Sequence, residues 1–247
     1  MVGPREIVPG VYGLGTEKVN WYLVESGGEL TAVDAGLPAF ADTLEADLKQ
    51  IGFTPGDVKA LVLTHSDGDH TGLTRTLAGA GARVLIHEDD QDTLRKPRAK
   101  GGDGSPVNLL PYLIQPGLWS LFVHMGRRGG AKPLSFDGAE TYTGGQRLNV
   151  PGSPLTIHTP GHTPGHNALL FEERGALFVG DALCTWNPVF GGTGPQLMPK
   201  AFNVSTSQCL HSLKAIEDLT ADVVLPGHGE PWVGTPASAV AEARGRA

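Results

Sequence analysis

The chain has 247 residues and a formal net charge of −7, with 40% hydrophobic and 18% charged residues. This composition supports a buried core and excludes global disorder. The acidic balance argues against a nucleic-acid partner, because contacts to phosphates require Lys and Arg.

The cysteines and the apolar stretches bear on the compartment. Cys184 and Cys209 do not form a secreted-type disulfide framework, and the first ten residues lack the apolar region of a signal peptide, so we expect a cytoplasmic protein. The most apolar stretch, residues 109–123, is short and contains Pro111 and Pro116. A bilayer span needs about 20 apolar residues, so we expect no membrane partner.

Strands and helices are expected to alternate along the whole chain. Apolar patterns predict strands over 19–25 and 30–34, a helix over 39–51 and a buried strand over 59–64. A helix over about 70–79 and a strand over 83–87 follow. After the irregular segment 89–135 we expect strands over 155–159, 167–173 and 176–180, a helix over about 205–219, a strand over 222–227 and a C-terminal helix. No linker divides the chain, which predicts one domain over 1–247.

Four of the predicted strands run into a side chain that can bind metal, namely His65, His162, Asp181 and His228. A single His or Asp in such a position is usually structural, for instance as a helix cap. Four of them are hard to attribute to capping, and ligands of α/β sheets bind beyond the carboxyl ends of the strands. The pattern therefore predicts a common metal site at these strand ends.

The first of these strand ends carries a dense cluster, HSDGDH, at residues 65–70. His65 and Asp67 can face one ion, because alternate side chains of an extended loop point the same way. Asp69 and His70 come next and can face a second ion. Buried carboxylates need a balancing charge, which a cation supplies.

These motifs resemble those of the metallo-β-lactamase superfamily. The family's H-x-H-x-D-H motif corresponds to HSDGDH, and its later motifs are similar to TPGHTPGH at 159–166, FVGD at 178–181 and LPGH at 225–228. NWYLVE and AVDAG near the N-terminus resemble the family's opening hairpin. The resemblance implies an α+β fold, a four-layer αβ/βα sandwich of two mixed β-sheets flanked by helices.

The resemblance also implies a site with two divalent metal ions. Carried over by position, the ligands are His65, Asp67 and His162 for the first ion, Asp69, His70 and His228 for the second, and Asp181 as the bridge. His166 stands where the family has a nearby histidine that is not a ligand.

Asp67 departs from the family motif, which has a histidine at that position. A carboxylate is a harder ligand, so iron and manganese become alternatives to zinc, the metal expected first. If Asp67 were too short to reach the ion, His65, His162 and Asp181 would remain, a set that suits a single non-haem Fe(II). That set resembles the iron persulfide dioxygenases of the superfamily.

The implied activity is hydrolysis of a small ester, lactone or thioester by a metal-bridged hydroxide, with Asp69 orienting the nucleophile. Two alternatives stay open: a non-haem iron persulfide dioxygenase, and a non-catalytic metal-binding protein. The expected partner is a small-molecule substrate, and the oligomeric state stays open.

Segment 89–135 is expected to be a cap and specificity insertion. It either lines the metal site or merely covers the sheets. Its candidate apolar wall consists of Tyr112, Leu118, Trp119, Phe122 and Met125. The remaining histidines, expected to be structural or at the surface because they lack partners at ligand spacing, are His87, His124, His158 and His211.

Overall fold

The computed structural model describes residues 3–16, 18–97, 110–131, 134–187 and 189–246, and the backbone of 101–102 and 105–106. Within these ranges the first sheet consists, in spatial order, of β1 (Arg5–Val8), β2 (Val11–Gly15), β3 (Asn20–Ser26), β4 (Glu29–Val33), β5 (Val58–Val62), β6 (Arg83–His87) and β9 (Glu140–Tyr142). The second sheet consists of β10 (Leu155–His158), β11 (Asn167–Phe171), β12 (Ala176–Gly180), β15 (Val223–Pro226) and β16 (Trp232–Val233). Two small hairpins pair β7 (Gly101–Gly102) with β8 (Ser105–Pro106), and β13 (Cys184–Trp186) with β14 (Thr193–Gln196).

Both sheets are mixed. β4, β5, β6 and β9 run parallel to one another, as do β12 and β15, while the remaining pairs of the two large sheets are antiparallel. Parallel neighbours end at the same edge of a sheet, so the loops after β5, β12 and β15 can meet there.

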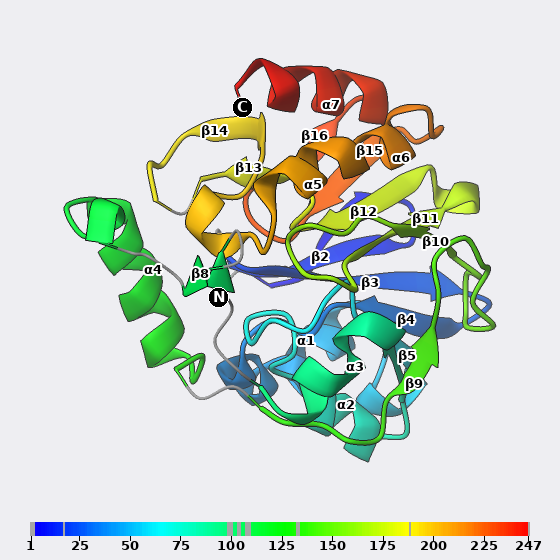
Figure 1. Cartoon of the computed structure of the whole chain (residues 1–247). Coiled ribbons are helices and arrows are strands. Elements are labelled where there is room, and N and C mark those ends of the chain that lie inside the picture. Colours follow the sequence, from blue (N-terminus) through cyan, green and yellow to red (C-terminus); the bar gives the residue numbers. More distant parts are fainter. Residues whose placement is uncertain are drawn as a thin grey trace.

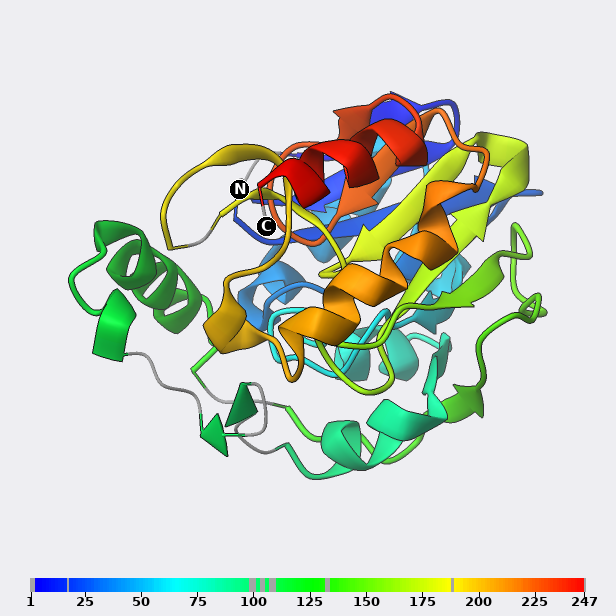
Figure 2. The same cartoon turned by 45° about the horizontal axis from the view of Figure 1, so that its top comes forward.

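Helices cover the outer face of each sheet, which gives four layers (Figures 1 and 2). The helices beside the first sheet are α1 (Leu44–Gln50), α2 (Thr74–Gly79) and α3 (Glu88–Arg95), and those beside the second are α5 (Thr206–Ser212), α6 (Lys214–Glu217) and α7 (Pro236–Gly245). Short 3-10 helices lie at Pro38–Asp42, Pro55–Asp57, Leu110–Tyr112, Glu172–Arg174 and Lys200–Phe202. This arrangement confirms the predicted αβ/βα sandwich.

The alternation of side chains along β5 shows how the layers are joined. Leu61 packs with residues of the helices, while Ala60 and Val62 pack between the two sheets against side chains such as Phe178. Successive strand residues point to opposite faces, so a strand covered on both sides reads as a continuous apolar run. β5 therefore lies in the middle of the core, and the loop that follows it starts from a strand that is packed on both faces.

Three predicted helices differ from the structure. The helix expected over 39–51 is divided into the 3-10 helix at Pro38–Asp42 and α1. The helix expected over 70–79 begins only at Thr74, because the chain before it bonds to the segment after β4: the Ala35 N–H donates to the His70 carbonyl and the Gly72 N–H to the Gly36 carbonyl. The helix expected over 205–219 is divided into α5 and α6. β1, β2, β9, β13, β14 and β16 had no clear apolar pattern and were not predicted.

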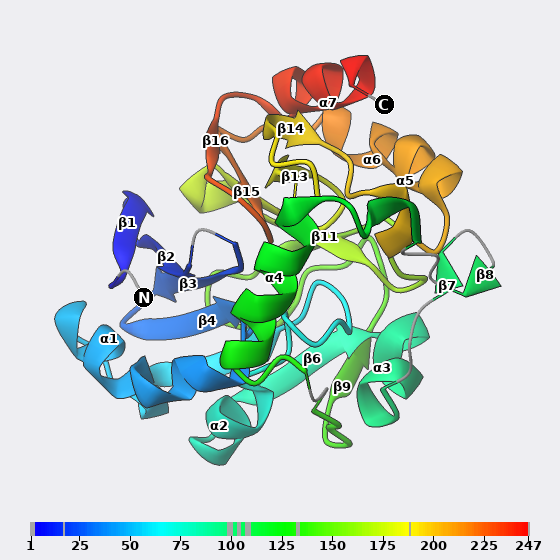
Figure 3. The same ribbon diagram turned by 90° about the vertical axis from the view of Figure 1, so that its left-hand side faces the viewer.

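The helix α4 (Pro116–Arg127) stands apart from the four layers. It lies to one side of the body in Figure 1 and at the front of the molecule in Figure 3. Its inner side chains Leu118 and Leu121 are buried. None of the helices in the described ranges is both long enough and apolar enough to cross a membrane.

Candidate metal centre

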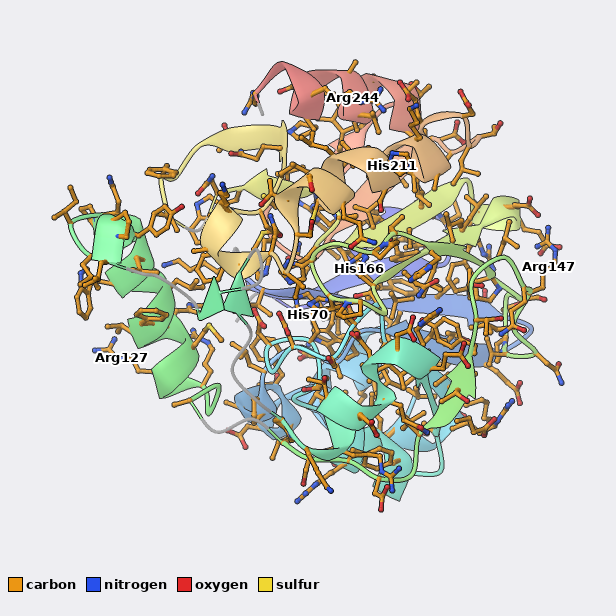
Figure 4. All side chains as sticks on the ribbon, in the orientation of Figure 1. His70, Arg127, Arg147, His166, His211 and Arg244 are labelled. Carbon is orange, nitrogen blue, oxygen red and sulfur yellow. The ribbon has the colours of Figure 1, made fainter. Side chains whose placement is uncertain are left out.

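The structure brings all seven predicted ligands together at one edge of the two sheets. Four lie in the loop after β5, one lies between β10 and β11, and two follow β12 and β15; they are His65, Asp67, Asp69, His70, His162, Asp181 and His228. Figure 4 shows His70 at the centre of the molecule, whereas Arg127, Arg147 and Arg244 lie at its periphery. The ends of β5, β10, β12 and β15 thus converge.

The donor atoms have the spacing that a bound ion requires. The Asp67 Oδ2 atom lies 3.1 Å from His162 Nε2 and 3.6 Å from His65 Nε2. On the other side, His228 Nε2 lies 3.6 Å from Asp69 Oδ2. Two ligands at 2.0–2.1 Å from a tetrahedral zinc ion are about 3.4 Å apart. Asp67 therefore reaches the first group of donors, and its side chain is not too short.

Asp181 lies between the two groups. Its Oδ1 atom is 3.5 Å from His70 Nε2, and its Oδ2 atom is 3.4 Å from His162 Nε2 and 3.2 Å from His228 Nε2. One carboxylate thus faces histidines of both predicted sets. This is the position that a bridging ligand would occupy.

Three buried polar atoms at the centre lack a hydrogen-bond partner among the residues that the structure describes. They are His65 Nε2, His70 Nε2 and Asp181 Oδ1. An unsatisfied buried polar group costs about 1–3 kcal/mol. Three in one place are explained if their lone pairs bind cations, so the residues present fit the metal ions that this donor set would hold.

The four histidines share one orientation. Each uses Nδ1 for a hydrogen bond to an oxygen atom outside the centre and turns Nε2 inward. The acceptors are Thr64 Oγ1 for His65 (2.9 Å), Asp34 Oδ2 for His70 (2.9 Å), Asn203 Oδ1 for His162 (3.1 Å) and the Lys18 carbonyl for His228. With the proton on Nδ1, the lone pair of Nε2 is available for a metal ion, because such outer hydrogen bonds fix the tautomer.

Asp34 organises the loop after β5 and was not singled out from the sequence. Its carboxylate accepts hydrogen bonds from the Thr64 N–H, the Thr64 hydroxyl and His70 Nδ1, and it is 2% exposed. Its φ of 59° lies in the left-handed region, which Asp and Asn tolerate better than most residues. The signal was available, because Asp34 also follows a predicted strand, at 30–34.

A second buried carboxylate, Asp90 in α3, ties two ligand loops together. It accepts hydrogen bonds from the Ser66 N–H at 3.0 Å and from the Gly165 N–H at 2.8 Å. Gly165 has no room for a side chain, because a Cβ atom there would lie 2.7 Å from the Asp90 nitrogen. The loop after β5 and the TPGHTPGH loop are thereby held in a fixed relation.

The charges at the centre favour a cation. Burial lowers the pKa of His70, but the carboxylates of Asp181, Asp34 and Asp69 outweigh it and raise that pKa to about 10. Burial also lowers the pKa of His228, and Asp181 in the first place raises it to about 9. The carboxylates thus stabilise positive charge, which protons or metal ions can supply.

Two other histidine predictions can be compared with the structure. His166 Nε2 accepts the Asp181 N–H at 3.0 Å, so it supports Asp181 and does not face the centre as a donor. The prediction that His87 and His158 lack partners at ligand spacing is wrong: they lie together with Asp89. Their rings stack in parallel, 4.5 Å apart at 11°. Ring lone pairs lie in the ring planes, so the two rings cannot direct them at one ion.

The apolar side chains of segment 89–135 do not form one wall over the centre. Leu118 is buried and Met125 packs against the core beside the first sheet, whereas Trp119 is 53% and Phe122 38% exposed. Tyr112 contacts Phe190 with ring centroids 5.9 Å apart. An amphipathic helix has two faces, and these residues divide between them.

Comparison with known proteins agrees with the motifs and the layers. The model of the metallo-beta-lactamase superfamily matches residues 14–228. The chain is 34% identical over 166 residues to the uncharacterized protein YobT of Bacillus subtilis. This match covers 66% of this chain and 61% of YobT. The chain is 25% identical over 248 residues to the probable metallo-hydrolase YflN of the same organism, which covers 93% of this chain and 87% of YflN.

A solved structure supports the same assignment. A metallo-beta-lactamase family protein of Thermus thermophilus is 28% identical, with a TM-score of 0.66 over 96% of this chain and 78% of the other. The match to the superfamily model spans all seven candidate ligands. The chain therefore belongs to the metallo-beta-lactamase superfamily.

Proposed function

We propose that this protein is a metal-dependent hydrolase that holds two divalent ions and cleaves a small ester, lactone or thioester. The observation that carries the proposal is the convergence of the Nε2 atoms of His70, His162 and His228 on the Asp181 carboxylate. His65 lies in the same group of donors, and Nδ1 of each of the four rings is bonded outside the centre. Such a donor set is arranged for metal ions and not for a nucleophilic triad.

Each of the two groups of donors would bind one of the two ions. His65, Asp67 and His162 would hold one ion, and Asp69, His70 and His228 the other, with Asp181 between them. Bound divalent cations lower the pKa of water to about 7 and polarise a carbonyl oxygen. Zinc fits the histidine-rich set best, while the Asp67 carboxylate makes iron or manganese acceptable at the first site.

The exposure of the side chains indicates the side from which a substrate arrives. The side chains of Asp67 and Asp69 are 26% and 14% exposed, whereas those of the four histidines and Asp181 are at most 3% exposed. This exposure supports the proposed role of Asp69, which is to orient a nucleophile and to pass a proton to solvent. The four buried histidines would hold the ions from the side that faces the protein interior.

A carbonyl substrate is favoured by the family and by the composition. An atrochrysone carboxyl ACP thioesterase of Aspergillus terreus is 27% identical over 165 residues, 66% of this chain and 38% of that protein. The net charge of −7 disfavours long phosphodiester polymers. Segment 89–135, as a cap beside the centre, would supply the specificity.

A substrate panel tests this proposal. The zinc-loaded protein is assayed with an acyl-coenzyme A thioester, an aryl ester, an N-acyl lactone, a lactam and an aryl phosphodiester. We expect turnover of the thioester, ester or lactone, and its loss in His162→Ala. His211→Ala, which alters an exposed histidine of α5, is the control and should keep full activity.

Two outcomes would contradict the proposal. Turnover of the phosphodiester alone would show that the substrate class is wrong. A protein that binds two ions and turns over none of the five substrates would indicate a non-catalytic metal-binding protein.

A further inference from the structure

The exposed apolar side chains are concentrated in one part of the molecule. Of the eight large hydrophobic residues that are exposed in the described part of the chain, seven lie in or next to segment 89–135. Six of them belong to the 3-10 helix at 110–112, α4 and the residues between: Leu110, Leu113, Ile114, Trp119, Phe122 and Val123. A typical monomer scatters such residues singly, so a gathering of this kind marks an interaction surface.

The seventh residue, Phe190, joins this gathering from a distant part of the sequence. Its ring lies 5.9 Å from that of Tyr112, and it is 60% exposed. Trp119 connects the two parts of the segment, since its Nε1–H donates to the Leu113 carbonyl at 2.8 Å and its ring lies 6.4 Å from Phe122. We call the seven exposed side chains the apolar face.

The charge around the apolar face is opposite to that of the chain. Residues 104–136 contain no Asp or Glu, and they include Arg127, Arg128 and Lys132, although the whole chain has a net charge of −7. In Figure 4 Arg127 points away from the body of the molecule at the end of α4. An anionic partner would be repelled by most of this acidic protein and attracted to the segment 104–136.

The shape of the region favours a lipid surface over a protein groove. α4 projects from the body in Figure 1 and forms its front in Figure 3, so the apolar face is presented outward. Its outer positions combine Trp119 and Val123, which are 53% and 50% exposed, with Arg127 at the end of the helix. Helices with aromatic and aliphatic residues beside basic ones lie in the interface of anionic bilayers.

We propose that the apolar face docks this protein on an anionic lipid surface. Docking there would bring α4, at the front of the molecule in Figure 3, close to the bilayer. The expectation from the sequence that the chain has no membrane partner concerned spanning segments, whereas this proposal concerns a contact at the surface of the bilayer. The inference goes beyond the proposed hydrolysis and does not depend on it.

Vesicle binding tests the inference without any substrate. The full chain is sedimented with vesicles of phosphatidylcholine alone and of phosphatidylcholine mixed with phosphatidylglycerol. We expect binding to the mixed vesicles, weaker binding to the neutral ones, and release as salt rises, since charges are screened beyond roughly 10 Å at 0.1 M and 3 Å at 1 M. Binding at low salt should weaken at least about tenfold in a double variant, Ile114→Ser with Trp119→Ser.

The control is Val233→Ser, which removes the eighth exposed hydrophobic side chain, 84% exposed on β16. It should bind as the unmodified protein does. The altered side chains are exposed, and a melting curve for each variant shows that the fold is kept. Equal vesicle binding by the double variant and the control would overturn the proposal.

Evidence for either of two other occupants of the apolar face would also overturn the proposal of a lipid surface. A dimer in sedimentation equilibrium that the double variant dissociates, with vesicles left unbound, would assign the face to a second copy of the chain. Binding of an acidic carrier protein by the unmodified chain and not by the double variant, again without vesicle binding, would assign it to a protein partner.

Discussion

Asp34→Asn is the substitution that most sharply separates the role of the outer hydrogen bonds from that of the fold. Asn tolerates the φ of 59° at this position, so the backbone is preserved. Its amide nitrogen, placed where Oδ2 stands, would face the Nδ1–H of His70 with a second donor. His70 would then move its proton to Nε2, the atom that turns toward the centre.

The expected loss is in metal affinity. Removing such a supporting residue costs about 10–100-fold in affinity, or about 1.4–2.7 kcal/mol. The hydrogen bond from the Thr64 hydroxyl to Oδ2 is lost, which costs about 1.5–3 kcal/mol of folding stability, and a domain with about 5–15 kcal/mol can sustain this loss. Competition with a chromogenic chelator measures the zinc affinity, and a melting curve follows the fold.

The control for Asp34→Asn is Asp57→Asn, which removes a carboxylate that caps the Thr54 N–H at the surface. It should leave zinc affinity unchanged. If Asp34→Asn bound zinc as tightly as the unmodified protein, the Asp34–His70 hydrogen bond would not fix the ligand, and the reasoning would be refuted.

Three further predictions concern the centre itself. Asp67→His should raise the ratio of zinc to iron in protein grown with both metals, because imidazole is softer; an unchanged ratio would place Asp67 outside the coordination sphere. Gly227→Ala should reduce metal content, because its Cβ would lie 2.4 Å from Asp181 Oδ1 and 2.5 Å from His70 Cε1, whereas Gly56→Ala, with ordinary contacts only, should not. Zinc binding at about pH 7 should release about two protons, one each from His70 and His228, whose pKa values are raised to about 10 and about 9, so that both rings are charged until metal displaces the protons. Calorimetry in two buffers measures the total release, and none would mean that both rings are neutral.

The clustering of the candidate ligands could be predicted from the sequence because these residues belong to local patterns. Each follows a buried strand, and strands read as apolar runs whose carboxyl ends share an edge. The same rule applies to Asp34, which also follows an apolar run, in AVDAG. The sequence alone does not indicate which residues its carboxylate contacts. Its partners are Thr64 and His70, and only the parallel pairing of β4 with β5 brings them beside it.

The supporting contacts could not be predicted, because they join segments far apart in the chain. The Lys18 carbonyl reaches His228 across 210 positions, and Asn203 reaches His162 from the end of the 3-10 helix before α5. Polar residues in loops carry no periodicity that would reveal such partners. The apolar residues of α4 were noticed in the sequence, but which of them face outward depends on how the helix packs.

The central claim is that seven side chains from four strand ends form one centre that holds two cations. Elemental analysis of the protein purified without added metal tests it most directly. We predict two equivalents of divalent metal per chain, zinc in the first place, and the loss of at least one in His162→Ala. A protein without bound metal, or one that carries a single iron and consumes O₂ with a persulfide, would contradict the claim.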